Sequence, residues 1–257
     1  MKTLAIIQAR TSSSRLPGKV LEKIGSKPMI LLQLERLKFS HMLDDYILAT
    51  SDDASDDLLA NTVKSSGFKV FRGDLEDVLG RFRQCALHEE ATTIVRLTGD
   101  CPLNDPKLID ELVSEFHQGD WEYLSNCADE NQLSVPDGFD IEVFSNQLLE
   151  RAFQEAQLPS EREHVTPWFR TIKSGAKWKH YEHMPRRQFF RVTVDDPMDL
   201  FVVRSIFSAL GTTNRHFGID EVISFLQKNP EIAMRNLSTI RNEGYLKSLA
   251  QETSSAQ

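Results

Sequence analysis

The first 120 residues alternate short apolar runs with longer amphipathic segments, and this alternation restricts the fold more than any other feature. The short runs are rich in β-branched and aromatic residues, as buried strands are, and comprise residues 3–7, 45–49, 68–71 and 93–97. Helical spacing of apolar residues, with prolines at first-turn positions, occurs over residues 28–39, 54–66, 74–90 and 106–116. This β-α-β-α order predicts a largely parallel sheet covered by helices on both faces.

Beyond residue 120 the regular alternation stops. Strand-like segments now lie further apart, with helical segments among them, at residues 121–126, 140–145, 177–184 and 189–194. Because no linker or internal repeat separates the two parts, we expect one domain over residues 1–245, with the second part extending the first sheet or forming a second lobe. Residues 246–257 are expected to form a flexible tail.

The balance of charge restricts the class of ligand. The 257-residue chain has a formal net charge of −8, whereas proteins that follow a nucleic-acid backbone normally have a basic excess. We therefore expect no nucleic-acid partner, and any polyanion must bind in a local basic pocket. No stretch approaches the about 18 consecutive apolar residues of a membrane span, so no membrane partner is expected.

The cysteines indicate a reducing compartment. Cys85, Cys101 and Cys127 are odd in number, far apart and without CxxC spacing, so the pattern favours neither a disulfide framework nor a cysteine zinc site. The N-terminal apolar run is interrupted by Arg10 and lacks a cleavable-signal pattern. We expect a cytoplasmic protein.

A basic cluster follows the first predicted strand. The segment QARTSSSRLPGKVL, residues 8–21, places Arg10, Arg15 and Lys19 among hydroxyl residues, a proline and a glycine. Ligands of parallel α/β sheets bind outside the carboxyl ends of the strands, and cations there need an anionic partner. The segment lacks GxxxxGK and GxGxxG patterns, so we expect side chains as well as backbone to hold phosphates. A solvated basic turn is the alternative interpretation.

Two of the four aspartates near predicted strand ends, Asp100 and Asp195, are not needed to cap helices. Asp105 and Asp196 each precede a proline and are well placed as N-caps of the helices that follow. Asp100 and Asp195 are then free at the ends of predicted strands, on the same edge as the basic cluster. Paired carboxylates of this kind suit Mg²⁺, which shares its ligand shell with substrate phosphates. The alternative is a structural role in which both carboxylates accept hydrogen bonds from turn amides.

Seven blocks in a fixed order together resemble a known family. They are IIQARTSSSRLPGKVL, ILATSDD, FRGDLEDVLGRF, RLTGDCPLNDP, DGFDIEVF, EREHVTPWF and RVTVDDPMDL. Over roughly residues 4–205 the chain resembles the cytidylyltransferase superfamily, which includes the acylneuraminate and Kdo cytidylyltransferases. The greatest similarity is to the branch named after spore coat polysaccharide biosynthesis protein F.

The resemblance implies both a fold and a reaction. The fold would be a Rossmann-like, glycosyltransferase-A-like three-layer αβα nucleotidyltransferase core with a mixed, mainly parallel sheet and a small C-terminal extension. Residues 1–120 would be the nucleotide-binding half and residues 121–245 the sugar-binding half. In the reaction, a hydroxyl of an acidic sugar attacks the α-phosphate of CTP, which releases pyrophosphate and leaves a CMP-sugar for surface polysaccharide or glycan biosynthesis. In-line displacement at phosphorus depends mainly on positioning and charge neutralisation, which basic residues and Mg²⁺ supply.

The resemblance also implies roles for individual residues. Arg10, Ser13, Arg15 and Lys19 match the family's triphosphate-binding loop, and Asp100 and Asp195 match its metal-binding aspartates. The full set of expected nucleotide-binding residues is Gln8, Ala9, Arg10, Ser13, Arg15, Lys19, Arg72 and Gly73. Arg10, Lys19 and Asp100 are the expected catalytic residues. For Arg72 and Gly73 the alternative is a tight turn with a surface arginine.

Four residues are candidates for the sugar site. Alternation in DIEVF puts Asp140 and Glu142 on one strand face, where they can accept hydrogen bonds from sugar hydroxyls, although a solvated face explains them equally well. Arg162 and His164 are candidates for binding a substrate carboxylate or a product phosphate. Ser160 and Glu163 have the spacing of a capping box, but Pro167 would then fall inside the same helix.

Other functions remain open at this point. A nucleotide-sugar-dependent glycosyltransferase with the same core is one alternative, and a non-catalytic nucleotide-binding partner is another. The sialate enzymes carry a longer insertion that helps to form a dimer and closes over the sugar, and we find no equivalent in this chain. A homodimer is possible, and the acceptor sugar is not identified by the sequence.

Overall fold

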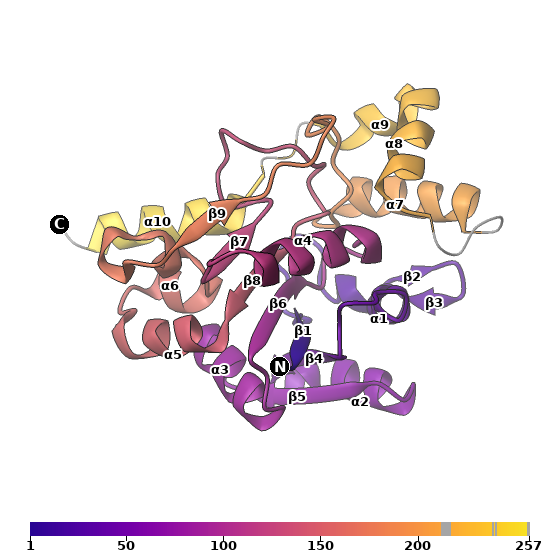
Figure 1. The fold of residues 1–257 in the computed structure, drawn as a ribbon. Coiled ribbons are helices and arrows are strands. Elements are labelled where there is room, and N and C mark those ends of the chain that lie inside the picture. Colours follow the sequence, from indigo (N-terminus) through magenta and orange to yellow (C-terminus); the bar gives the residue numbers. More distant parts are fainter. Residues whose placement is uncertain (212–216, 238, 240, 256–257) are drawn as a thin grey trace.

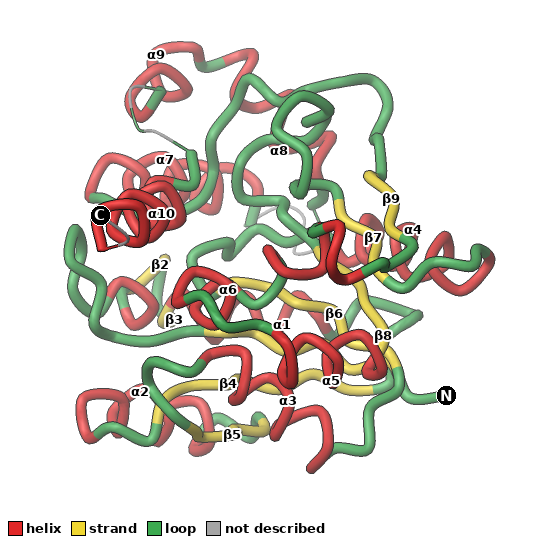
Figure 2. The backbone as a smooth tube through the Cα atoms, turned by 90° about the vertical axis from the view of Figure 1, so that its left-hand side faces the viewer, coloured by secondary structure: helices red, strands yellow, loops and turns green. Residues whose placement is uncertain are grey.

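The centre of the molecule is a single seven-stranded sheet (Figure 1). The structure is a computed structural model that describes residues 1–211, 217–237, 239 and 241–255. The strands of the sheet are β1 (Thr3–Gln8), β4 (Asp45–Ser51), β5 (Lys69–Gly73), β6 (Thr93–Thr98), β7 (Tyr123–Ser125), β8 (Glu142–Ser145) and β9 (Trp178–His180). Their order is β5-β4-β1-β6-β8-β7-β9, so β5 and β9 are the two edges, as Figure 2 shows from the side.

The sheet is mixed and mainly parallel, as expected. Strands β1, β4, β5 and β6 pair in parallel, with Ile6 of β1 opposite Ile47 on one side and Arg96 on the other. Strand β8 pairs antiparallel with both β6 and β7, and β9 pairs parallel with β7. The change of direction falls at β8, where the segment after residue 120 extends the first half of the sheet rather than forming a second lobe.

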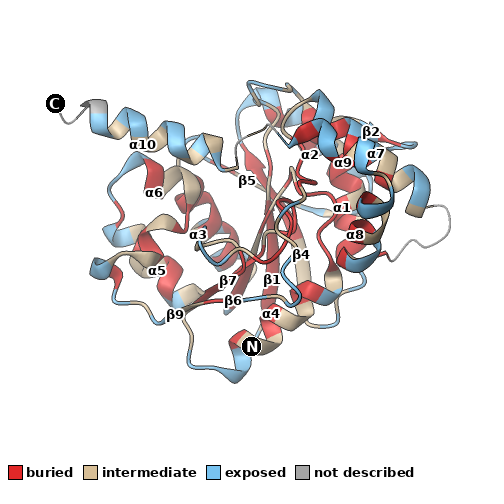
Figure 3. Cartoon of the chain, turned by 90° about the horizontal axis from the view of Figure 1, so that it is seen from above, coloured by how far each residue is buried: buried red, intermediate tan, exposed pale blue. Residues whose placement is uncertain are grey.

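Helices cover both faces of the sheet, and Figure 3 shows buried positions concentrated between these layers. Alternate residues of β1 enter different hydrophobic clusters, Ala5 and Ile7 on one face and Leu4 and Ile6 on the other. The first face packs against α1 (Met29–Leu37), α2 (Asp57–Ser65), α4 (Pro106–Gln118), α7 (Pro197–Leu210) and α8 (Ile219–Lys228). The second packs against α3 (Val78–His88) and α5 (Asn146–Glu155), with α6 (Pro159–His164) beside them.

Both proposed aspartate caps are confirmed. Asp105 Oδ1 accepts a hydrogen bond from the Lys107 amide at 2.9 Å at the start of α4. Asp196 Oδ1 accepts from the amides of Met198 and Asp199 at 2.8 and 3.0 Å at the start of α7. The carboxylates of Asp100 and Asp195 are therefore available for other contacts.

Residues 189–194, expected to be a strand, do not form one. Arg191 makes only an isolated bridge with Asp137, and the amides of Val192 and Val194 donate to the carbonyls of Asp137 and Asp100. The apolar side chains of Val192 and Val194 are fully buried all the same. The β-branched residues of this segment are therefore explained by burial against the loops that contain Asp100 and Asp137, and not by a position in the sheet.

The C-terminal residues also differ from expectation. Residues 246–255, expected to belong to a flexible tail, lie in α10 (Glu243–Ser255), while residues 256–257 lie outside the described part of the chain. Helix α10 docks on α6, where the Glu252 carboxylate accepts hydrogen bonds from the amide and hydroxyl of Ser160 at 2.6 and 3.0 Å. The remaining short elements are β2 (Lys23–Ile24), β3 (Lys27–Pro28) and α9 (Pro230–Ala233). Short 3₁₀ helices also lie at Lys19–Leu21, Ala54–Asp56, Pro167–Arg170, Ile172–Ser174 and Met234–Asn236.

In the part of the chain that the structure describes, no helix combines the length and the apolar character needed to cross a bilayer.

Candidate active site

A cavity of about 550 Å³ opens at the carboxyl edge of β1 and β6, where the loop after β1 begins. Both halves of the chain contribute to its walls, and α10 closes part of it. Among the residues proposed from the sequence, those that line the cavity are Gln8, Ala9, Arg10, Ser13, Arg15, Lys19, Asp100, Asp140, Glu142, His164 and Asp195. Arg72, Gly73 and Arg162 do not line it.

Lys19 lies between Asp100 and Asp195, the two aspartates that do not cap a helix. Its Nζ is 3.1 Å from Asp100 Oδ2 and 2.8 Å from Asp195 Oδ1, and its side chain is only 11% exposed. Burial lowers the pKa of Lys19, but the two carboxylates outweigh burial and raise it. Burial likewise opposes ionisation of Asp100, yet Lys19 and the Thr98 hydroxyl hold its pKa at about 2. Asp100 and Asp195, 95 positions apart in sequence, are therefore brought together around Lys19.

The two arginines of the loop also face acidic side chains. Arg15 lies 3.0 Å from Asp195 Oδ1 and 2.8 Å from Glu243 Oε2, and Arg10 lies 3.4 Å from Glu163 Oε1. The pairs of Arg10 with Glu163 and of Arg15 with Glu243 join partly exposed groups, and ion pairs of this kind are weak and readily exchanged. An anionic ligand can therefore replace the carboxylates on Arg10 and Arg15.

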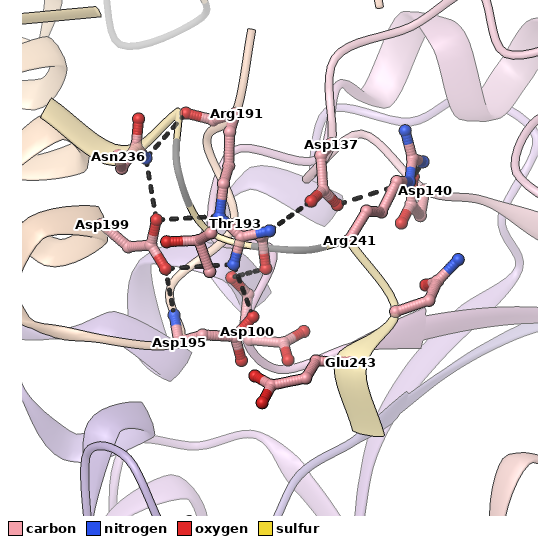
Figure 4. A network of polar contacts seen from close by, with 12 residues as sticks. Asp100, Asp137, Asp140, Arg191, Thr193, Asp195, Asp199, Asn236, Arg241 and Glu243 are labelled. Atoms are coloured by element: carbon pink, nitrogen blue, oxygen red, sulfur yellow. Dashed lines mark hydrogen bonds and ion pairs between the residues drawn. The ribbon is translucent and has the colours of Figure 1, made fainter. Parts of the chain in front are cut away.

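Arg191 holds three acidic side chains together (Figure 4). Its guanidinium contacts Asp137, lies 2.6 Å from Asp195 Oδ2 and 2.9 Å from Asp199 Oδ1. Asn236 supports the group by donating to Asp199 Oδ1 at 2.8 Å. Arg191 thus fixes one oxygen of Asp195 and leaves the other facing Lys19. This role of Arg191 is not predicted from the sequence, where the residue is simply an arginine inside a strand-like segment.

Arg241 joins the same network from the C-terminal side. It lies 2.5 Å from Asp140 Oδ1 and 3.7 Å from Asp137 Oδ1. Asp137 and Asp140 flank Gly138, where an added Cβ would lie 2.5 Å from the Thr193 backbone nitrogen. This glycine, with φ of +110°, lets the loop approach residues 192 and 193 closely enough to contact Arg191.

Each carboxylate oxygen of Glu142 has a donor. The Tyr123 hydroxyl donates to its Oε1 at 2.5 Å and Arg96 pairs with its Oε2. Burial raises the pKa of Glu142, but Arg96 and Tyr123 outweigh it and hold the pKa below its usual value. Glu142 therefore lines the cavity as a fixed carboxylate within an ion pair. Asp140 precedes β8 in a loop, so the two acids share the cavity without sharing a strand.

Arg72, Gly73 and Arg162 have structural environments instead. Arg72 pairs with Asp57 at 2.6 Å and donates to the Ser51 carbonyl, and Gly73 is the last residue of the edge strand β5, so these two residues lie in a strand and not in the tight turn given as the alternative. Arg162 pairs with Asp77 at 2.6 Å, where it fixes the start of α3.

Arg81 of α3, which was not among the residues proposed from the sequence, also lines the cavity. It is 2% exposed, donates to the Asp74 carbonyl, and leaves Nε without a partner among the described residues.

The start of α6 corrects the proposed capping box. Helix α6 begins at Pro159, and Glu161 accepts from the amides of Gln157 and Leu158 at 3.0 and 3.1 Å. Ser160 and Glu163 do not pair with each other, since their partners include Glu252 and Arg10. Helix α6 ends at His164, before Pro167.

Helix α10 also fixes His164. The Ser248 hydroxyl lies 3.1 Å from His164 Nε2, and the Tyr245 ring packs edge-on against the imidazole at 5.1 Å between centroids. Burial lowers the pKa of His164, which favours the neutral ring at pH 7.

The donor set at Asp100 and Asp195 fits a hard divalent cation that takes its other ligands from a phosphate substrate. The described residues contain no group of three or more His, Cys, Asp or Glu side chains arranged to hold a metal alone. Eight basic and seven acidic side chains line the cavity, so the cavity is close to neutral overall. A bound triphosphate would leave a large negative excess there, which a divalent cation between it and the two aspartates would offset.

The fold and this arrangement of cations and carboxylates are those of a nucleotide-binding transferase. A family model described as cytidylyltransferase matches residues 4–205. The chain therefore belongs to the cytidylyltransferase family, a class of nucleotidyltransferases, and the resemblance seen in the sequence motifs is confirmed.

Individual relatives agree with this assignment. The chain is 33% identical to the spore coat polysaccharide biosynthesis protein SpsF of Bacillus subtilis, over 90% of this chain and 96% of that protein. It is 33% identical to the 8-amino-3,8-dideoxy-manno-octulosonate cytidylyltransferase of Shewanella halifaxensis, over 63% of this chain and 69% of that protein. Among solved structures, a cytidylyltransferase from Leptospira borgpetersenii superposes with a TM-score of 0.84 at 35% identity, covering 91% of this chain and 97% of that one.

Proposed function

We propose that this protein transfers CMP from CTP to an acidic sugar of the 3-deoxy-octulosonate or sialate type and releases pyrophosphate, as a step in the synthesis of a surface polysaccharide. The observation that carries the proposal is Lys19 held between Asp100 and Asp195 in a cavity that Arg10 and Arg15 also line. Similarity to SpsF and to an octulosonate cytidylyltransferase supports the choice of acceptor and pathway.

The basic side chains of the loop bind the triphosphate in this proposal. Arg15 exchanges Glu243 for phosphate oxygens, and Arg10 exchanges Glu163. Lys19 turns from the aspartates to the phosphates, which its flexible stem permits, and neutralises charge as pyrophosphate departs. Neutralisation matters because displacement at phosphorus is promoted mainly by positioning and charge.

Asp100 and Asp195 would hold Mg²⁺ once Lys19 has turned away. The bound ion would offset charge on the phosphate oxygens, which is the chemistry that these two carboxylates alone cannot supply. Arg191 keeps the Asp195 carboxylate in place, since its contact with Oδ2 leaves Oδ1 toward the cavity. Asp140 and Glu142 line the cavity where they can contact the sugar.

The cysteines support a cytoplasmic location. Cys85, Cys101 and Cys127 are all unpaired thiols, and the first two are buried. A reducing compartment preserves that state.

The test is product formation across a panel of acceptors. The purified protein is incubated with CTP, Mg²⁺ and one of 3-deoxy-manno-octulosonate, 8-amino-3,8-dideoxy-manno-octulosonate, N-acetylneuraminate or neutral mannose. Phosphorus NMR should show a CMP diester and pyrophosphate with an acidic sugar and neither with mannose. Absence of a CMP-sugar with every acidic sugar would refute the proposed reaction, and transfer from a ready-made nucleotide sugar would favour a glycosyltransferase instead.

A further inference from the structure

Asp140 differs from the other acidic side chains in the cavity by having an unoccupied oxygen. Seven acidic side chains line the cavity. In six of them both carboxylate oxygens have a hydrogen-bond or ion-pair partner among the described residues: Asp100, Asp137, Glu142, Glu163, Asp195 and Glu243. Asp140 contacts Arg241 through Oδ1, while Oδ2 has no partner within the described residues. A carboxylate with one fixed oxygen and one free oxygen is suited to accept a proton.

The charges around Asp140 come from several segments. Arg241 pairs with it, Asp137, Glu142 and Asp100 add negative charge nearby, and Asp140 in turn helps to raise the pKa of the Cys101 and Cys127 thiols. Its backbone carbonyl accepts from Asn104 Nδ2 at 3.4 Å. Burial raises the pKa of Asp140, Arg241 lowers it, and the neighbouring acids raise it again, to about 7. That value lies where a general base works best near neutral pH.

A continuous series of ion pairs connects Asp140 to the proposed metal-binding residues Asp100 and Asp195. Arg241 connects Asp140 to Asp137, Arg191 connects Asp137 to Asp195, and Lys19 connects Asp195 to Asp100. Figure 4 shows the part of this network from Asp140 through Arg241, Asp137 and Arg191 to Asp195. Asp140 therefore lines the same cavity as the loop residues to which the proposed function assigns the triphosphate.

Transfer of CMP to a sugar hydroxyl requires removal of one proton. We propose that Asp140 is the general base of this reaction, with Oδ2 accepting the proton of the attacking hydroxyl and Arg241 positioning the carboxylate through Oδ1. The hydroxyl oxygen forms a bond to the α-phosphorus, the bond from the α-phosphorus to the β-bridging oxygen breaks, and pyrophosphate leaves with that electron pair. Protonated Asp140 returns its proton to water after product release. This inference rests on the proposed function.

His164 is the competing candidate. It lines the same cavity and its burial favours the neutral ring, but Ser248 and Tyr245 of α10 hold the imidazole, and its charged neighbours are Glu163, Arg96, Arg10 and Glu142 rather than the metal-binding pair. The variant His164→Gln therefore serves as the matched comparison for Asp140→Asn.

The experiment measures kcat and KM from pH 5 to 9 with Mg²⁺, CTP and the octulosonate acceptors. Wild-type kcat should rise with pH through a pKa near 7, because the base must be ionised. Asp140→Asn should lower kcat by about 10²- to 10⁴-fold, the scale for loss of a general base, with CTP affinity unchanged by calorimetry. Arg241→Gln should move the acidic limb to higher pH, since Arg241 favours the ionised form, whereas Arg241→Lys should keep it in place.

Three results would overturn the inference. They are an unchanged kcat and pH profile in Asp140→Asn, a loss confined to the KM of the sugar, and disappearance of the acidic limb in His164→Gln. If wild-type protein transfers CMP to none of the acidic sugars, the proposed function has failed separately. In that case carbon NMR of aspartate-labelled protein with Mg²⁺ and CTP still measures the pKa of Asp140. The Asp140 carboxyl signal is identified by its absence from the spectrum of Asp140→Asn and should titrate near pH 7. Titration near pH 4 would contradict the inference.

Discussion

Glu243, in the first turn of α10, places its Oε2 2.8 Å from Arg15 Nη1. The Glu243 carboxylate is therefore paired with the guanidinium that the proposed mechanism assigns to the triphosphate. Replacing Glu243 with Gln removes a competing anion and a negative charge beside the ligand. We expect Glu243→Gln to bind CTP a few-fold more tightly than wild type in calorimetry with Mg²⁺. The control is Glu252→Gln, which loosens α10 at Ser160 without touching the loop and should leave CTP affinity unchanged. Weaker binding by Glu243→Gln would show that Glu243 supports the nucleotide site instead.

Lys19→Ala tests the anion-binding role of the loop. Loss of Lys19 removes a buried donor that acts on the phosphates, so kcat/KM for CTP should fall by about 10²-fold or more. The control, Lys27→Ala, removes an exposed lysine paired with Glu35 and should behave as wild type. Unchanged CTP affinity together with unchanged turnover in Lys19→Ala would exclude the loop from the mechanism.

The paired aspartates should act as a unit. Asp100→Asn and Asp195→Asn are each expected to lower kcat by about 10²-fold, and the double variant should lose little more, because both would serve one ion. A Mg²⁺ titration of CTP binding should show reduced metal dependence in all three. Multiplicative losses would place the two carboxylates in separate roles.

The neighbouring caps provide the matched comparison. Asp196→Ala removes N-cap hydrogen bonds and should cost about 1 kcal/mol in urea unfolding, whereas Asp105→Ala should cost more, because it also removes the acceptor of the buried Ile219 amide; neither should change kcat much. Retention of full stability would indicate that the caps contribute nothing. A large loss of kcat would show that the division between capping and free aspartates is wrong.

The pH dependence of stability follows from Asp140. Its pKa in the folded protein is about 7, above the value of 3.8 for an unperturbed group, so the folded state retains the proton that the unfolded chain loses between those values. Stability should therefore fall as pH rises from about 4 to about 7. In urea unfolding of the nucleotide-free protein, the free energy of unfolding should fall less steeply with pH in Asp140→Asn than in wild type. The difference between variant and wild type should therefore be more favourable to the variant at pH 8 than at pH 4. An identical pH profile in the two proteins would show that Asp140 ionises normally.

The sequence predicted the parts of the fold that depend on periodicity and local signals. The alternation before residue 120 and the caps at Asp105 and Asp196 follow from periodicity and turn signals, which short stretches of sequence specify. The sequence places Asp195 at the same edge as Asp100 through a strand over residues 189–194 that does not form, and the position of Asp195 beside Lys19 depends on long-range ion pairs.

The sequence predicted less where long-range ion pairs decide the outcome. Arg162 resembles a ligand-binding residue, but its guanidinium pairs with Asp77, 85 residues away, and Arg191 and Arg241 gain their roles from partners that no spacing reveals. The helix at residues 243–255 was missed because its polar sequence is stabilised partly by docking on α6.

The most direct measurement of the central claim follows the phosphorus atoms of CTP. Wild-type protein is supplied with Mg²⁺, 8-amino-3,8-dideoxy-manno-octulosonate or 3-deoxy-manno-octulosonate, and CTP labelled at either the α- or the γ-phosphate. The account expects the α-label to appear in a sugar-linked CMP and the γ-label in pyrophosphate, in equal amounts. An α-label that appears only in free CMP, or remains in CTP with both sugars, would contradict the account.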